Sequence, residues 1–580
     1  MIDNISYFRR TVIRQILLIL FWISGLSTSI YVIVWIRLFK LVFGDTFFVT
    51  NSVIVAFMSG LAIGSYYFGQ KIDQKKIELE MFMWFELGIG IYAIFLLIVF
   101  PLLTPLHKFI FLQFGHQTVV INVFKFAITF ILLITPSILI GATFPVLSRF
   151  FIQTSKRASR EVGDLYFVNI LGAVFGCYLT GFFFLQILGI KQTFIFAAVF
   201  HIIIAVLVQS LLNKIHTTIQ LETEFYDQKL KHLETDKSVQ PQFLIKSVII
   251  GFGISGFLSL SYLVLWFRSL IYVIGTDTYA FYTMLTVFLL GLSIGALLYP
   301  RILRLQKNLI SIFAVIEILI GFWGIISVLL IPQLVPLDEK VLFSVNSSEA
   351  WNWQIIIDMF YSGLIFLIPT LLMGATIPLV TKILLTNFEE RGQKIGKIYA
   401  VNIFGAILGL NITAFLLVHN VGIQISIIFT GFINFLIGLI ILFLRSLKYG
   451  KVAKTFLIFG SVAIFYFLSL FIPSNLIIKL FQKGEKHNKT IYAKEGINTT
   501  VTLHQDINAN SFMLASNGVG VVGSTIDWTT IQRISGHLPL VLHHRPDTIL
   551  TIGFRDGETL TSILLHQVKQ VDCVEKYLEI

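Results

Sequence analysis

Residues 163–181 read GDLYFVNILGAVFGCYLTG, and residues 396–414 read GKIYAVNIFGAILGLNITA. In both stretches an asparagine and two glycines occupy the same places, namely Asn169, Gly172 and Gly176, then Asn402, Gly405 and Gly409. A long apolar sequence that occurs twice in one chain predicts a membrane domain built by duplication.

The duplication extends well beyond these two stretches. Ten residues recur 231 positions later: Ser24, Gly25, Tyr31, Trp35, Arg37, Gly44, Gly60, Gly64, Glu86 and Gly90, as Ser255, Gly256, Tyr262, Trp266, Arg268, Gly275, Gly291, Gly295, Glu317 and Gly321. GATFP at 141–145 returns as GATIP at 374–378, now 233 positions later. Apolar composition alone does not keep such matches in register, so we expect two homologous halves, 1–240 and 241–450.

Composition places the chain in a bilayer. Of 580 residues, 56% are hydrophobic and only 13% are charged. Apolar stretches of spanning length lie near 13–38, 48–69, 82–103, 121–148, 163–188, 192–213, 246–273, 279–300, 309–332, 354–381, 396–418 and 422–444. A further apolar run at 455–473 predicts an extra span within 451–475. The fold class is therefore mainly α, with six helices in each half.

The net charge of +12 reflects orientation rather than a nucleic-acid partner. The basic residues fall in alternate loops on the side of the N-terminus, which the positive-inside rule assigns to the cytoplasm. We thus expect a multi-pass protein of the cell membrane with a cytoplasmic N-terminus. An even number of helices per half makes the halves parallel repeats.

Two duplicated acids carry the most chemistry within the membrane. Glu86 and Glu317 lie in apolar spans, where a carboxylate is costly and faces a partner or a wet cavity. One interpretation is a polar site for a cation or proton, together with Asn169 and Asn402. The other is that each glutamate hydrogen-bonds within its own half and fixes packing.

Other duplicated residues favour structural roles. The paired glycines let a neighbouring backbone approach closely. Pro145 and Pro378 are expected to kink or break their helices. Arg37 and Arg268 are expected to snorkel to the outer interface, with Trp35 and Trp266 in the aromatic belt there. With two cysteines and scattered histidines, neither a disulfide framework nor a metal site is predicted.

Polar and charged residues return after Pro473, and a soluble module is expected over 476–580. Alternating patterns at 500–505 and 511–516 predict strands, and Asn517-Gly518 predicts a hairpin turn. Residues 548–559, TILTIGFRDGET, indicate a buried strand, a glycine turn and the start of a helix.

A second strand is expected at 571–575, VDCVE, ending in an acid. This order is the first half of a nucleotide-binding Rossmann unit, in which Gly553 and Gly557 admit a ligand and Glu575 binds ribose hydroxyls. Arg555 stands where such loops usually carry another glycine, and its long side chain obstructs that approach.

These pieces together resemble the membrane-anchored spermidine synthase-like proteins. The residues that carry the resemblance are GATFPVLSR at 141–149, LYFVNILGAVFG at 165–176 and its copy IYAVNIFGAILG, EGINTTVTL at 495–503, SNG at 516–518, GHLPLVLHHRPDTILTIGFRDGET at 536–559, and VDCVE. The resemblance implies that the loop with Gly553, Asp556 and Gly557, and Glu575, hold decarboxylated S-adenosylmethionine. It also implies that Gln532 and His537 lie near that pocket.

In such synthases an amine attacks the methylene next to a sulfonium, and an aspartate beyond the second strand deprotonates the amine. The sequence reaches Ile580 before that aspartate, so we expect it to be a fragment. Three functions stay open: a membrane-bound aminopropyltransferase acting on a polyamine, a transporter or channel for a cation or amine, and a pseudoenzyme. An odd number of spans would put the module outside, while lysines on both sides of the last span leave its side undecided.

Overall fold

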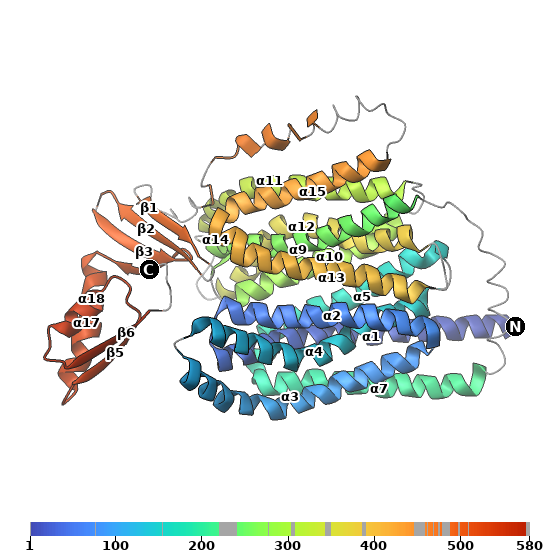
Figure 1. Ribbon diagram of the computed structural model, residues 1–580, viewed down its shortest axis with the longest axis horizontal. Coiled ribbons are helices and arrows are strands. Elements are labelled where there is room, and N and C mark those ends of the chain that lie inside the picture. The colour runs from blue at the N-terminus through green and yellow to red at the C-terminus, as the bar shows by residue number, and fades with distance from the viewer. Residues whose placement is uncertain are drawn as a thin grey trace.

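The computed structural model is a bundle of long helices with a smaller mixed module at one end (Figure 1). It describes residues 2–75, 77–115, 117–152, 155–219, 241–275, 278–302, 308–342, 350–385 and 390–445, and residues 459–575 except 461, 464, 468, 474–475, 478–487, 497–498 and 509. In this described part, twelve helices are long and apolar enough to cross a bilayer. The predicted class, a mainly helical multi-pass membrane protein, is confirmed.

Each half contributes six spans. The first half comprises α1 (Ile2–Phe43), α2 (Phe47–Lys75), α3 (Glu78–Phe114), α4 (Thr118–Phe151), α5 (Ser155–Leu179), η1 (Thr180–Phe184), α6 (Leu185–Ile187) and α7 (Gly189–Ile219). The second comprises α9 (Gln242–Ile274), α10 (Thr278–Ile302), α11 (Leu309–Leu342), α12 (Ala350–Leu384), α13 (Arg391–Ile412), η2 (Thr413–Leu417), α14 (Val418–Val421) and α15 (Ile423–Arg445).

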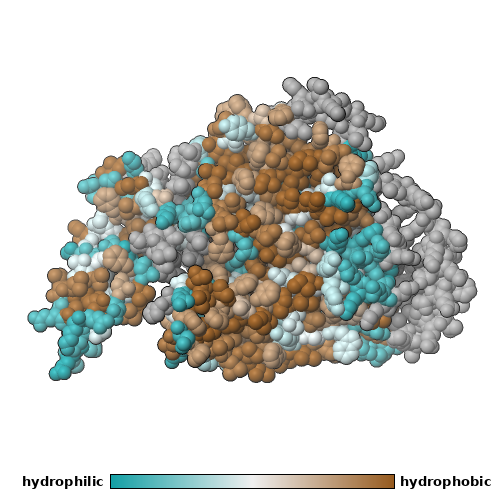
Figure 2. Space-filling model, viewed as in Figure 1, coloured by the Kyte–Doolittle hydropathy of each residue, from teal (hydrophilic) through white to brown (hydrophobic). Residues whose placement is uncertain are grey.

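The two halves use the same helix contacts. In the first half α1 packs on α5, α2 on α4 and α3 on α7, and in the second half α9 packs on α13, α10 on α12 and α11 on α15. The halves meet through α2 with α13 and through α5 with α10, which are equivalent pairs. Hydrophobic side chains cover the exposed face of the bundle, and polar ones gather towards its ends (Figure 2).

The duplicated glycines pack backbone against backbone, as predicted. A Cβ added at Gly172 or Gly176 would overlap the carbonyl oxygen of Trp22 or Leu26 in α1. A Cβ at Gly409 would overlap the carbonyl oxygen of Phe257 in α9. The α1–α5 and α9–α13 contacts therefore require glycine at these places.

Gly409→Ala is expected to lower the free energy of unfolding by about 1–3 kcal/mol, because the new methyl group meets a backbone atom that only a helix shift can move. Gly363→Ala is the matched control, since a Cβ at Gly363 meets nothing within 4 Å. Thermal unfolding in detergent measures both variants. Equal midpoints for the two would contradict the close approach.

The expected aromatic belt is wrong for the duplicated tryptophans. Trp35 is 1% exposed and Trp266 is 0% exposed, so neither reaches the lipid interface. Each stacks on a tyrosine of its own helix, Tyr31 or Tyr262, at ring-centroid distances of 5.5 and 4.4 Å. The sequence does not distinguish a buried aromatic pair from an interfacial one, because both place Trp near a helix end.

The expected helix breaks at proline are also not seen. α4 runs through Pro145 and α12 runs through Pro378 without interruption. The helices that change their hydrogen-bonding pattern are α5 and α13. They continue into the π-helical segments η1 and η2 at equivalent positions.

An ion-pair cluster joins the halves at the end of the bundle that carries the N-terminus. Arg149 at the end of α4 pairs with Asp73 of α2 at 2.9 Å, and also with Glu78 of α3. The Asp73 carboxylate accepts hydrogen bonds from the backbone N–H groups of Gly392 and Gln393, at 3.1 and 2.8 Å. Asp73 thus caps the first turn of α13 in the other half.

The chain then returns along the bundle after α15. Residues 451–458 of the predicted extra span lie outside the described residues, but Phe465 packs against Phe435 midway along α15. The side chain of Gln424, at the start of α15, donates to the carbonyl of Pro473 at 2.9 Å. The segment from 465 to 473 therefore runs antiparallel to α15 towards the end opposite the N-terminus.

The C-terminal module holds two sheets. β1 (Asn488–Glu495), β2 (Thr500–Asp506), β3 (Ser511–Ser516) and β4 (Val519–Gly523) form an antiparallel sheet. After α17 (Ile526–Leu542), β5 (Thr548–Ile552) pairs in parallel with β6 (Gln570–Val574) across α18 (Glu558–Leu564). Asn517 and Gly518 have φ values of 49° and 81°, as the predicted hairpin turn between β3 and β4 requires.

The module contacts the bundle at the end opposite the N-terminus (Figure 1). A carboxylate oxygen of Glu495 in β1 accepts a hydrogen bond from the backbone N–H of Ile423, the first residue of α15, at 2.6 Å. Arg268 near the end of α9 donates to the Thr500 hydroxyl at 3.3 Å. These contacts join the antiparallel sheet to the second half.

Acidification is expected to loosen this sheet. His504 in β2 is 2% exposed, and its ring nitrogens contact the hydroxyls of Thr490 and Thr502 at 3.2 and 2.8 Å. Burial lowers the pKa of His504 below its usual 6.5. The unfolded chain therefore binds more protons, and stability falls as the pH drops through about 6.5. Limited proteolysis between pH 7.5 and 5.5 should show faster cleavage at low pH, and His504→Gln should remove that dependence.

Candidate functional site

The loop after β5 is the candidate ligand site in the soluble module. Gly553 and Gly557 have φ values of 98° and 84°, and Arg555 also lies in the left-handed region at 56°. The N–H of Gly553 donates to the carbonyl of Val574 at 2.7 Å, which places the loop beside the end of β6. The predicted strand, glycine turn, helix and second strand are all present.

Glu575 follows β6 directly and faces this loop. Its Oε2 accepts hydrogen bonds from the backbone N–H groups of Phe554 at 2.7 Å and Arg555 at 3.3 Å. A carboxylate that lies against glycine-rich backbone at the ends of two parallel strands is placed to receive ribose hydroxyls. The structure therefore brings Gly553, Gly557 and Glu575 together, as the sequence predicted.

Gln532 and Asp556 also meet at this loop. Gln532 of α17 is 4% exposed, and its amide group, oriented to donate, lies 2.9 and 3.0 Å from the two carboxylate oxygens of Asp556. Asp556 also accepts the N–H of Glu558 at 3.2 Å. These contacts fix the loop on α17.

His537 lies further along α17, at the other end of α18. Its Nδ1 is 2.8 Å from Nε2 of His566, which follows α18. Gly536 makes this helix contact possible, since a Cβ there would lie 2.8 Å from the carbonyl oxygen of Thr559. The structure thus separates His537 from Gly553 and Glu575 by the length of α18.

Arg555 narrows the approach to the loop. Its Cγ and Nε atoms lie 3.9 Å from the place that a Cβ of Gly553 would take. The side chain therefore lies over the glycine that a ligand would pass. This is the obstruction expected from the sequence.

The duplicated acids of the membrane domain are fully buried. Glu86 in α3 and Glu317 in α11 are both 0% exposed. The hydroxyl of Ser24 donates to Oε1 of Glu86 at 2.7 Å, and Nδ1 of His201 lies 2.6 Å from its Oε2. His201 was not singled out in the sequence, although its position is equivalent to Asn434 at the 233-residue offset.

The two asparagines serve a different contact. Asn169 of α5 donates to the carbonyl of Phe21 in α1 at 3.2 Å, and Asn402 of α13 donates to the carbonyl of Phe252 in α9 at 3.0 Å. Among the hydrogen bonds of the described residues, none joins either asparagine to Glu86 or Glu317. The asparagines hold the glycine-packed helix pairs together.

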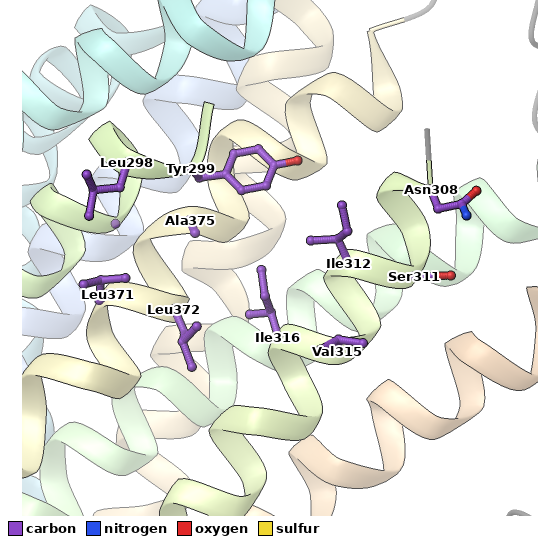
Figure 3. Close-up of a pocket in the computed structure, with 11 residues that line it drawn as sticks. Leu298, Tyr299, Asn308, Ser311, Ile312, Val315, Ile316, Leu371, Leu372 and Ala375 are labelled. Carbon is purple, nitrogen blue, oxygen red and sulfur yellow. The ribbon is translucent and has the colours of Figure 1, made fainter. Parts of the chain in front are cut away.

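A cavity of about 510 Å³ lies between α10, α11 and α12 (Figure 3). Apolar side chains line most of it, among them Leu298, Ile312 and Leu372, and Tyr299 also contributes to the lining. Helix positions advance by about 100° each, so Glu317 points away from the face of α11 that carries Ile312. The cavity suits an acyl chain better than a cation.

No family model matches this chain. A polyamine aminopropyltransferase of Oceanobacillus iheyensis is 24% identical to it over 309 residues, which cover 52% of this chain and 55% of that protein. The chain thus spans about half the length of this curated relative. The matched stretch is longer than the segment 476–580, so it includes membrane helices.

Several solved transporters align with about three quarters of this chain. The human organic anion transporter MFSD10 is 10% identical with a TM-score of 0.46, covering 74% of this chain and 98% of that one. A bacterial homologue of the iron transporter ferroportin is 13% identical with a TM-score of 0.45, covering 73% and 97%. The major facilitator superfamily transporter FucP is 13% identical with a TM-score of 0.44, covering 74% and 97%.

Proposed function

We propose that this chain is a membrane-bound, aminopropyltransferase-like protein whose C-terminal module binds decarboxylated S-adenosylmethionine. The observation that carries the proposal is the contact of Glu575 with the glycine loop at the ends of β5 and β6. In this arrangement Glu575 accepts the ribose hydroxyls, and Gly553 lets the nucleoside pass close to the backbone. The similarity to a polyamine aminopropyltransferase supports this ligand class.

The reaction class is a nucleophilic substitution at carbon. The nitrogen of a polyamine attacks the methylene next to the sulfonium, so a C–N bond forms and a C–S bond breaks. The electron pair of the broken bond stays on sulfur as a thioether, and the amine loses a proton. The loop and Glu575 orient the donor for this step, and the proton of the product ammonium passes to solvent water.

Calorimetric titration of the full chain with decarboxylated S-adenosylmethionine tests the proposal. We expect one site per chain with a Kd between about 1 μM and 1 mM, the usual range for metabolites. A titration without heat, under conditions in which the protein unfolds cooperatively on heating, would rule out the nucleoside site.

A second candidate function is transport of an amine or other cation. Its support is the pair of fully buried acids at equivalent positions of the two halves. Proteoliposomes loaded with the protein should then take up radiolabelled spermidine faster than empty liposomes. Replacing both Glu86 and Glu317 with glutamine should abolish that difference, and unchanged uptake would remove this candidate.

A further inference from the structure

The two halves place corresponding side chains around their buried glutamates. At the 231-residue offset, Ser24, Tyr31 and Glu86 correspond to Ser255, Tyr262 and Glu317, and at the 233-residue offset His201 corresponds to Asn434. The helices that carry them are α1, α3 and α7 in one half and α9, α11 and α15 in the other. Each cluster is therefore one copy of the same arrangement.

The cluster of the first half is closed. Glu86 receives one hydrogen bond at each carboxylate oxygen, from Ser24 and from His201. Tyr31 stacks on the His201 ring at a centroid distance of 5.3 Å and an interplanar angle of 10°. Both carboxyl oxygens of Glu86 thus have a partner, while the second ring nitrogen of His201 and the Tyr31 hydroxyl have none among the described residues.

In the cluster of the second half, the buried glutamate lacks hydrogen-bond partners. Neither carboxyl oxygen of Glu317 has a hydrogen-bond partner among the described residues, although the side chain is 0% exposed. Asn434, 1% exposed, also has its amide nitrogen and oxygen without partners. Ser255 lies beside the carboxyl without completing a hydrogen bond. Asn434 stands where His201 stands in the first half, but no hydrogen bond joins it to Glu317.

We propose that Glu317 is a proton-binding site and that it carries a proton in this conformation. A carboxylate buried without donors is far more costly than a neutral carboxylic acid in the same place. Protonation forms one O–H bond at Glu317 and removes the buried negative charge. Glu86 differs, because a ring nitrogen of His201 lies 2.6 Å from its carboxyl oxygen.

The groups around Glu317 leave the proton as the simplest ligand. From α9 they are Ser255 and Tyr262, whose hydroxyl contacts the carbonyl oxygen of Ile320 at 3.5 Å, and from α15 the group is Asn434. None of these carries a positive charge. Two titratable residues in the first half of α12, Asp358 and Tyr361, lie further from Glu317 along the bundle axis.

One hydrogen bond fixes the positions of Asp358 and Tyr361 along the bundle axis. Trp323 of α11 donates to the carbonyl of Ile365 in α12 at 2.9 Å, so these two residues lie level. Because the helices are antiparallel, Tyr361 is level with a residue beyond Trp323, about 15 Å from Glu317 at 1.5 Å per residue. Glu317 is thus isolated from charged partners within its own half.

This inference goes beyond the proposed function, since it makes the halves chemically unequal. The second half gains or loses a charge when helix packing admits water to Glu317. A proton released there leaves a carboxylate that only water or a donor can stabilise. The second half is therefore where proton binding and helix packing are linked.

Infrared spectroscopy of the purified full chain in lipid nanodiscs tests the proposal. We expect the C=O stretch of a protonated carboxylic acid at pH 7.5 in the wild type, and its loss in Glu317→Gln. Glu86→Gln is the matched control and should keep the band. A spectrum of Glu317→Gln that retains the same band would overturn the proposal.

Thermal unfolding measurements keep the test decisive if a variant folds poorly. Glutamine has the shape of a neutral glutamic acid, so Glu317→Gln should keep the midpoint of thermal unfolding within about 2 °C of the wild type. Failure of Glu317→Gln to fold would show that an anion is needed and would contradict the proposal. A rise of the wild-type midpoint in sodium over choline chloride, lost in Glu317→Gln, would assign the site to a metal cation instead.

Discussion

Glu86→Gln is expected to lower the free energy of unfolding by about 1–3 kcal/mol, the cost of leaving a buried hydrogen-bonding group without its partner. Glu86 accepts from Ser24 and from His201, and all three side chains are shielded from water. Glutamine offers one acceptor in place of two, so one buried donor loses its partner. Thermal and denaturant unfolding in detergent measure the loss.

A double-mutant cycle assigns the effect to the pair. His201→Asn introduces the residue of the other half, and it should cost about as much as Glu86→Gln when made alone. Both changes together should cost clearly less than their sum. Glu390→Gln, on the 53% exposed side chain of an i, i+4 pair with Lys394, serves as the surface control and should change little. Additive losses would show that the two residues act independently.

Glu575→Gln is expected to weaken binding of decarboxylated S-adenosylmethionine about 10- to 100-fold, because it removes a charged acceptor of ribose hydroxyls. The loop should keep its shape, since glutamine still offers an oxygen to the N–H of Phe554, which lies 2.7 Å from Glu575 in the wild type. Equilibrium binding of the radiolabelled nucleoside measures the change.

Two further variants sharpen this result. Asp572→Asn changes an exposed acid of the same strand that contacts Gln570 at 3.1 Å, and it should leave affinity unchanged. Arg555→Gly removes the side chain that lies over Gly553 and suits the positive φ of that position, so affinity should rise. An Asp572→Asn variant as weak as Glu575→Gln would show that net charge, rather than the loop contact, governs binding.

The duplicated sequence predicted most of the membrane fold. Apolar length located all twelve spans, and the copied glycines predicted a close backbone approach to α5 and α13, although not that α1 and α9 are the partners. These signals are strong because a bilayer dictates span length and because a close backbone contact excludes every side chain. The strands of the hairpin and the β5–β6 pair followed from alternation and turn residues in the same way.

Side-chain partners were less accessible to sequence reasoning. His201 is the clearest omission, because one histidine in an apolar helix carries no period, and only its alignment with Asn434 marks it. Trp35 was placed at the lipid interface because burial depends on which face α7 covers, which the sequence of α1 does not contain. The predicted grouping of Asn169 with Glu86 was wrong for a similar reason. Both residues contact α1, but Asn169 binds the carbonyl of Phe21 and Glu86 binds the hydroxyl of Ser24.

The C-terminal module is expected on the opposite face of the membrane from the N-terminus. One native cysteine reports on its side. Cys573 is exposed on β6, while Cys177 is buried in the bundle. A membrane-impermeant maleimide applied to intact cells should label Cys573, while an epitope tag at the N-terminus should stay hidden until the cells are permeabilised. Labelling of Cys573 only after permeabilisation, together with exposure of the tag, would place the module inside and the N-terminus outside. Protection or exposure of both together would contradict the return of the chain along α15 that puts the N-terminus and the module on opposite faces.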